Sequence, residues 1–217
     1  DGSHARMIPM NEHEKTTRLA TVDAGAVAAV LHAAFPPGTE AVLVPLIRQL
    51  AEGSPVSLAR LASGLGWPVE SVRSALAIEY EDEAIVGAVV SLRETPHTIG
   101  IEGVGFHLVR LDALFVPAIL GKIARVTSPC GATGKTVRLD VGPDRLLDAD
   151  PLGAAMSIVL EACGGLGLRR SFCDRARFFV SAEAGAEWLG AVRGGVLGVP
   201  AAFALGADVA RRVGWQS

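Results

Sequence analysis

The sequence has little of several features that would place it in a common protein class. Only three of its 217 residues are cysteine, an odd number that cannot complete a disulfide framework. No apolar run of about 18 residues is free of charges, so we expect no membrane-spanning helix. The net charge of −3 gives no surplus of positive charge, so we expect no nucleic-acid partner.

What remains is a chain with ample material for a hydrophobic core. Half of its residues are hydrophobic, and 217 residues suffice for one sizeable domain or for a small domain followed by a larger one. Free thiols and the lack of a visible secretory signal indicate a cytoplasmic protein. Residues 1–6 resemble a vector remnant, so we expect native sequence to begin at Met7. The many alanines, glycines and arginines are typical of a high-GC bacterial source.

The first hundred residues predict a winged-helix module after a tag remnant and mobile arm at residues 1–23. Prolines and glycines at segment ends and a Ser57 cap predict helices over 24–34, 43–51, 57–65 and 68–77. Runs of β-branched residues predict the two strands of a wing over 84–92 and 98–101. The module therefore spans residues 24–103. Such modules bind DNA or dock against another domain. The last helix carries one base, Arg73, and one acid, Glu70, so we favour docking.

Residues 104–217 predict an α+β core domain in which the strands pair antiparallel. We expect strands over 124–127, 136–141, 157–160 and 177–180, and helices over 112–120, 184–192 and 201–213. The last of these is apolar but short and interrupted by charges, which favours a core helix. Together the two parts give an α+β fold, with an N-terminal winged-helix-like module packed on a core of antiparallel strands and flanking helices.

Two residues of the second half stand out as candidates for chemistry. Asp112 is an acid within the apolar run 106–117, and Cys173 lies among arginines that favour its thiolate form, the form that attacks electrophiles and binds soft metals. A buried strand cysteine is the other interpretation of Cys173.

The other two cysteines invite plainer interpretations. Cys130, in a glycine-rich turn, is either a soft-metal ligand or a buried structural thiol, and we favour the second because no other cysteine lies at zinc-site spacing. Cys163 either approaches the site from a flexible loop or is incidental. The run from Gly131 to Thr136 is not a phosphate loop, because position 129 is proline and a strand is expected to follow. His32, His97 and His107 receive no role.

Several segments together resemble organomercurial (alkylmercury) lyases. They are residues 43–57, Gly66-Trp67-Pro68, residues 92–95, residues 111–114 with Pro117, residues 124–128 with Cys130, residues 132–134, and residues 170–173 with Phe178-Phe179. They run in order across about residues 40–205. The resemblance implies a winged-helix-like part packed on a core of antiparallel strands and helices.

The resemblance also implies a mechanism. In that family two cysteine thiolates hold mercury while an aspartate relays a proton to the departing carbon, giving a hydrocarbon and Hg(II). Mercury is soft, so thiolates are its natural ligands, and a placed acid can protonate the carbon. By this match Asp112 is the proton relay and Cys173 a mercury ligand, while Cys130 matches a family cysteine outside the catalytic pair. The first catalytic cysteine falls on Val109.

Valine neither ligates a metal nor carries a proton, so Val109 leaves three hypotheses open. The first is a divergent lyase that takes its second sulfur from Cys163 or from an external thiol, with no other cofactor. The second is a lyase-fold enzyme that performs acid–base chemistry at Asp112 and Cys173 on an organic substrate of bacterial metabolism. The third is a module that binds a small molecule or a metal. The sequence predicts a small-molecule or organometallic substrate and leaves the oligomeric state open.

Overall fold

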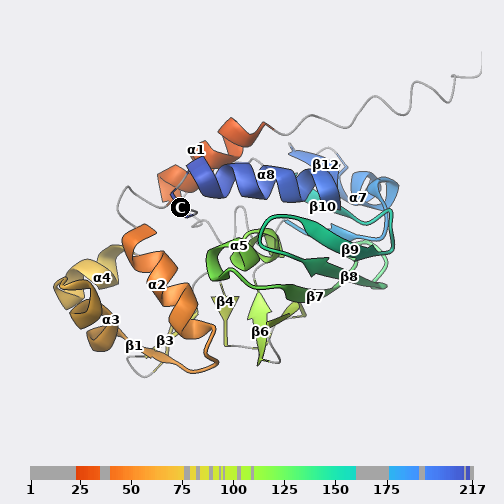
Figure 1. The fold of residues 1–217 in the computed structure, drawn as a ribbon. Coiled ribbons are helices and arrows are strands. Elements are labelled where there is room, and N and C mark those ends of the chain that lie inside the picture. Colours follow the sequence, from red (N-terminus) through yellow and green to blue (C-terminus); the bar gives the residue numbers. More distant parts are fainter. Residues whose placement is uncertain are drawn as a thin grey trace, which may run out of the picture.

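The computed structural model contains a long antiparallel sheet, a smaller sheet and helices beside them (Figure 1). It covers residues 23–34, 40–75, 79–81, 84–87, 90–92, 94, 96–101, 104–108, 110–159, 176–190, 194–212 and 214–215. Small helices lie at the N-terminal side, and strands with covering helices form the rest. Among these described residues, no helix has both the length and the apolar character needed to cross a membrane.

Four helices open the described chain. They are α1 (Ala24–Ala34), α2 (Glu40–Leu50), α3 (Leu58–Leu65) and α4 (Val69–Ala75), with the short strand β1 (Val56–Ser57) between α2 and α3. The Ser57 hydroxyl accepts the Arg60 N–H at 3.3 Å, which caps α3 as the sequence predicts. Gly66, at φ 67°, ends α3 because glycine tolerates the left-handed conformation.

The larger sheet has nine strands, and every pairing in it is antiparallel. It contains β1, β2 (Glu79–Glu81), β3 (Ala84–Gly87), β4 (Val90–Ser91), β5 (Thr98–Ile101), β6 (Val104–Leu108), β7 (Ala124–Pro129), β8 (Thr136–Val141) and β9 (Leu146–Asp150). Its order is β1-β3-β4-β6-β5-β7-β8-β9, with β2 paired to β3. Burial alternates along β7 and β8, so one face of this part of the sheet packs inward.

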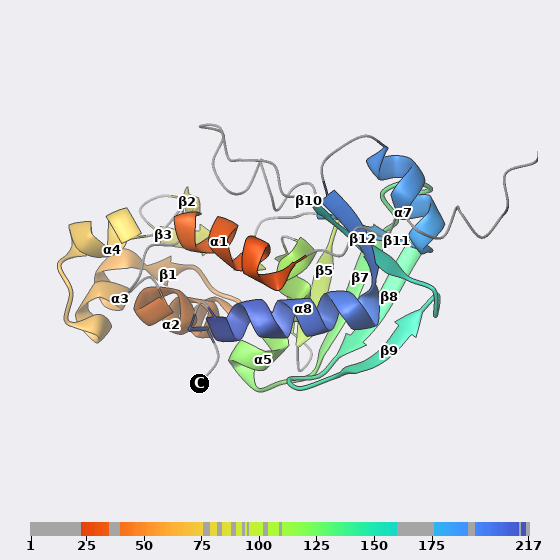
Figure 2. The same cartoon turned by 90° about the horizontal axis from the view of Figure 1, so that it is seen from above.

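A smaller sheet and two helices complete the second half. Strands β10 (Ala155–Val159), β11 (Phe178–Phe179) and β12 (Gly194–Gly198) lie in the order β11-β10-β12, and α7 (Ala182–Leu189) and α8 (Val199–Arg212) flank them. Both views show α1 beside α8, although the two helices lie at opposite ends of the sequence (Figures 1 and 2). This contact joins the start of the described chain to its end.

The structure confirms the α+β class and the winged-helix-like start, but it corrects the predicted wing. The sequence paired residues 84–92 with residues 98–101. Instead, β3 pairs with β1, β2 and β4, and β5 pairs with β6 and β7. The run 84–92 contains two strands whose ends, Gly87 and Ser91, pair with each other, so the chain turns back inside it. The hairpin next to the helices is therefore β2–β3.

The helix predicted over 112–120 is also two elements. Residues Arg110–Leu114 form the 3-10 helix η2, and α5 (Val116–Leu120) follows after a break at Phe115. Pro117 explains the break, because within a continuous helix its ring would clash with the carbonyl of Ala113. At the start of a new helix the same proline fits, since the N–H that it lacks has no partner there.

Candidate functional site

Asp112 lies in η2, at the point where the chain leaves the larger sheet. Strand β6 ends at Leu108, and η2 begins at Arg110. The Asp112 side chain belongs to a residue only 7% exposed, and its backbone carbonyl accepts the Phe115 N–H at 3.2 Å. The short helix therefore holds an acid inside the protein.

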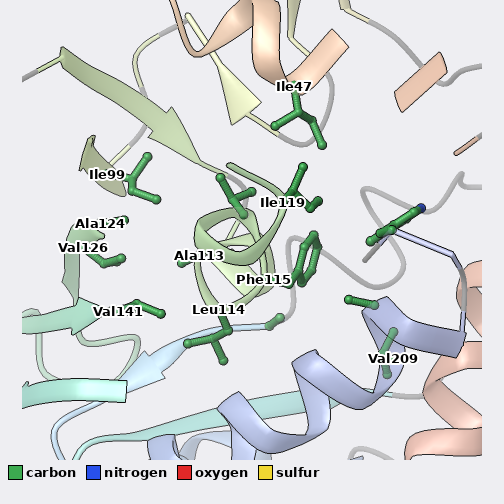
Figure 3. Close-up of a cluster of buried hydrophobic side chains, with 14 of the residues drawn as sticks. Ile47, Ile99, Ala113, Leu114, Phe115, Ile119, Ala124, Val126, Val141 and Val209 are labelled. Carbon is green, nitrogen blue, oxygen red and sulfur yellow. The ribbon is translucent and has the colours of Figure 1, made fainter. Parts of the chain in front are cut away.

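The residues that follow Asp112 fix η2 in place by burial. Ala113, Leu114 and Phe115 are each at most 1% exposed. Figure 3 shows them between strand residues on one side, including Val126, and Val209 of α8 on the other. Burial of the Leu114 and Phe115 side chains stabilises the fold by about 1.5–3 kcal/mol each. The position of Asp112 is thus set by a packed core.

Burial also sets the charge state of Asp112. Removal from water raises the pKa of the Asp112 carboxyl well above its ordinary value, because desolvation disfavours the carboxylate. Within the part of the chain that the structure describes, no hydrogen bond or ion pair engages this carboxyl to offset the desolvation. A carboxyl in this state keeps its proton to a higher pH and can deliver it to a substrate atom.

The other positions that the sequence implicates lie outside the described residues. These are Val109, Cys163 and Cys173. The pairing of Cys173 with Asp112 and the approach of Cys163 therefore stay predictions. Among the described residues, no cluster of three or more histidine, cysteine, aspartate or glutamate side chains could hold a metal ion.

The described chain resumes three residues after Cys173 and is held firmly there. Ala176 is fully buried. The Arg177 N–H donates to the Ser157 hydroxyl at 3.0 Å, and the Ser157 N–H donates to the Arg177 carbonyl at 2.9 Å. Phe178 in turn accepts the Gly131 N–H at 2.9 Å. The segment that follows Cys173 is therefore tied both to β10 and to the turn after β7.

Cys130 is a buried thiol in that turn. Its residue is 3% exposed, and the turn closes by two backbone bonds, Cys130 N–H to Lys135 O at 2.7 Å and Gly134 N–H to Cys130 O at 2.9 Å. Burial by itself raises the pKa of the Cys130 thiol, but hydrogen bonds from the Thr133 side chain and from backbone N–H groups, the first of them that of Val180, bring the pKa below its ordinary value. Strand β8 follows the turn, so the region is a hairpin, as the sequence predicts.

The sequence gave no role to His97, and the structure buries it beside Ser128. His97 Nδ1 lies 2.6 Å from Ser128 Oγ, and the hydroxyl also donates to the Pro129 carbonyl at 3.3 Å. Which of the two groups donates in the contact to His97 depends on the tautomer of the imidazole. Thr98, next to His97, pairs with both His107 of β6 and Thr127 of β7. His97 and Ser128 therefore lie near the end of β6 that leads to η2.

Comparison with protein families covers nearly all of the described chain. Residues 90–211 match the family model described as alkylmercury lyase, and residues 19–90 match the model described as the helix-turn-helix domain of alkylmercury lyase. The two matches meet at residue 90, within β4. Asp112 therefore lies within the part of the chain that matches the alkylmercury lyase model.

Individual relatives agree with the family match. The chain is 37% identical over 175 residues to an alkylmercury lyase of Staphylococcus epidermidis (77% of this chain, 81% of the relative) and 36% identical over 180 residues to one of Pseudomonas putida (79% and 84%). It also resembles the crystal structure of the mercury-bound form of MerB2, with a TM-score of 0.71, 20% identity, and coverage of 88% of this chain and 98% of that one. This last likeness concerns the fold.

Proposed function

Because this chain belongs to the alkylmercury lyase family, whose members cleave carbon–mercury bonds, we propose that it cleaves organomercurials by protonolysis, with Asp112 as proton relay and Cys173 as a thiolate ligand of mercury. The observation that carries this proposal is the Asp112 carboxyl, which is buried, raised in pKa and placed in the half of the chain that matches the lyase model. The reaction would take place in the cytoplasm, with a small organomercurial as substrate.

The proposed step balances as a proton-for-metal exchange. The Cys173 thiolate binds the mercury of R–Hg–X and displaces X⁻, and a second thiolate adds electron density to the metal. The carbon–mercury bond then breaks with its electron pair on carbon, which takes the proton from Asp112 to give R–H. Asp112 becomes a carboxylate, and Hg(II) stays on the two sulfurs. Placing an acid in this way accelerates proton transfer by roughly 10²–10⁴-fold.

The source of the second sulfur is the open point of this mechanism. Valine at position 109 supplies no ligand, so the second thiolate comes from Cys163 or from an external thiol. These two sources differ in a measurable way. With Cys163 as ligand, arene release in a single turnover does not depend on the concentration of external thiol, which only removes Hg(II) afterwards, and Cys163→Ser abolishes this release. With an external thiol as ligand, the rate rises with thiol concentration and Cys163→Ser has no effect.

The test of the proposal is arene release from an arylmercurial. Purified protein is incubated with phenylmercury acetate and excess thiol, and benzene is measured by gas chromatography against a protein-free sample. The proposal predicts release above the protein-free rate, and loss of that release in Cys173→Ser. Cys130→Ser is the matched control, because Cys130 lies in a structural turn. Release no faster than in the protein-free sample overturns the proposal.

A second function is favoured by Val109 in particular. With an apolar residue in place of a thiol, the same fold could use Asp112 and Cys173 for acid–base chemistry on an organic substrate, Asp112 exchanging a proton and Cys173 acting as nucleophile or orienting group. Genes for mercury reduction and transport beside this one would support the lyase, whereas biosynthetic genes would support the alternative.

A further inference from the structure

A cavity of about 370 Å³ lies between helix α2 and the second half of the chain. Its walls come from α2, from α5, from the turn between β8 and β9, from α8 and from Trp215 near the C-terminus. Its volume is within the range of small-molecule sites, about 300–1,000 Å³. Among the described residues that line it, none is Asp112 and none contains sulfur.

The apolar wall of the cavity is built from rigid side chains. Trp215 is 4% exposed and its ring packs against Phe115, with centroids 5.0 Å apart and planes at 44°. Ile119 is buried as well, and Phe203 of α8 adds a second aromatic ring to the lining. Ile119 and Phe203 lie on two different helices and Trp215 lies in the segment after α8, so a flat apolar group would find its surface already formed.

Trp215 is held in place by the end of α8. The Trp215 N–H donates to the Ala210 carbonyl at 2.8 Å, and the Gly214 N–H donates to the Arg211 carbonyl at 3.2 Å. Gly214 has φ 76°, the left-handed conformation that a helix end closed by these two hydrogen bonds requires. The helix terminus thus turns the chain back and presents the indole to Phe115. The aromatic wall therefore exists before any ligand binds.

The described residues of the lining include two charged side chains, which are not equivalent. Asp144, in the β8–β9 turn, pairs with neighbouring Arg145 at 3.9 Å. Arg48, in the last turn of α2, has no hydrogen bond or ion pair within the described part of the chain. Among the described lining residues, the uncompensated charge is therefore positive. A guanidinium binds a carboxylate through two parallel N–H bonds, which matches an anionic ligand head.

We propose that this cavity binds a small organic carboxylate with a flat or branched apolar body. The carboxylate pairs with Arg48, and the body packs on Phe203 and Trp215. Both features are needed: the guanidinium selects the negative charge, and the aromatic wall selects the body. A short carboxylate without a ring and a ring without a charge each satisfy only half of the site.

The test is calorimetric titration of the full chain with benzoate, compared with benzamide and acetate. We expect benzoate to bind, and benzamide and acetate to bind at least tenfold more weakly. Arg48→Gln weakens benzoate binding at least tenfold, whereas Arg60→Gln, which changes an exposed arginine of α3 outside the cavity, leaves it unchanged. Equal binding of benzamide, equal binding by Arg48→Gln, or no benzoate binding at millimolar concentration overturns the proposal.

A second variant tests the apolar half of the site independently of charge. Ala207 lines the cavity from α8 and is partly exposed, so Ala207→Leu fills the space without a change in the protein's charge. We expect this variant to lose benzoate binding while its thermal unfolding midpoint stays close to that of the parent chain. Retention of full binding by a folded Ala207→Leu protein would place benzoate elsewhere and contradict the proposal. Neither measurement depends on mercurial cleavage.

Discussion

His97 and Ser128 form a buried pair, with 2.6 Å between Nδ1 and Oγ, although 31 residues separate them in the chain. They are 5% and 1% exposed, so neither polar group can exchange its partner freely for water. The pair joins the start of β5 to the end of β7, beside the strand that leads to Asp112. A buried polar group that loses its partner costs about 1–3 kcal/mol.

This pair gives the first prediction, a double-mutant cycle on stability. His97→Leu and Ser128→Ala should each lower the free energy of unfolding by about 0.5–1.5 kcal/mol, because each removes the hydrogen bond between the two buried side chains. The double variant should lose less than the sum, with a coupling of about 1 kcal/mol. Urea unfolding followed by circular dichroism measures all four proteins. Strict additivity would show that the two side chains do not stabilise each other.

The Ser157 hydroxyl gives the second prediction. It accepts the Arg177 N–H at 3.0 Å, next to the pairing of Met156 in β10 with Phe178 in β11. Ser157→Ala removes this acceptor from a fully buried position and should destabilise the fold by about 1–3 kcal/mol. Thr127→Ala, an exposed strand position, is the control and should change stability by less than about 0.5 kcal/mol. Similar urea midpoints for the two variants would contradict the role given to Ser157.

The third prediction follows from the raised pKa of Asp112. From about pH 4, the ordinary value for aspartate, up to the raised pKa, the folded protein binds more protons than the unfolded chain. Asp112 therefore makes stability fall as pH rises, by at most about 1.4 kcal/mol per pH unit. Asp112→Asn removes this dependence. The free energy of unfolding of the variant minus that of the parent chain should therefore grow between pH 5 and pH 7.

Glu183 provides the control for that experiment. Its carboxyl pKa is lowered, first by the hydrogen bond from the Ser181 side chain and then by a backbone N–H, and the side chain is exposed. A lowered pKa lies below this pH range, so the difference between Glu183→Gln and the parent chain should stay constant from pH 5 to pH 7. An Asp112→Asn difference that is equally constant would mean that Asp112 is not desolvated.

The fourth prediction concerns the missing thiol. Val109→Cys restores a sulfur at the position that matches the first catalytic cysteine of the family. A thiol tethered within the protein acts at a millimolar or higher effective concentration. At micromolar external thiol, single-turnover arene release by the variant should therefore be at least about tenfold faster than by the parent chain. An unchanged rate would show that the second sulfur does not limit the reaction.

The local elements could be predicted wherever one residue type determines them. Ser57 capped α3 and Gly66 ended it, and β5 and β8 have the predicted bounds. Strand β9 was missed because it is an edge strand whose burial does not alternate, and β12 because three of its five residues are glycine. Strand order could not be predicted from the sequence either, because pairing depends on contacts between segments far apart in the chain.

The candidate site shows the same division. Asp112 could be chosen from the sequence because an acid within an apolar run is unusual and because the surrounding segments resemble a family. His97 could not, because only the pairing of β5 with β7 brings Ser128 to it. The cavity beside Trp215 depends on five separate parts of the chain, and no spacing in the sequence indicates it.

The central claim is that Asp112 delivers the proton to carbon, and one comparison tests it directly. Wild-type protein and Asp112→Asn are given phenylmercury acetate and equal thiol at pH 7, and benzene is measured in a single turnover. Asparagine keeps the shape of the side chain but has no acidic proton. The account predicts release by the wild type and loss of at least about 10²-fold in the variant, with mercury still bound. Equal release by the two proteins would contradict it.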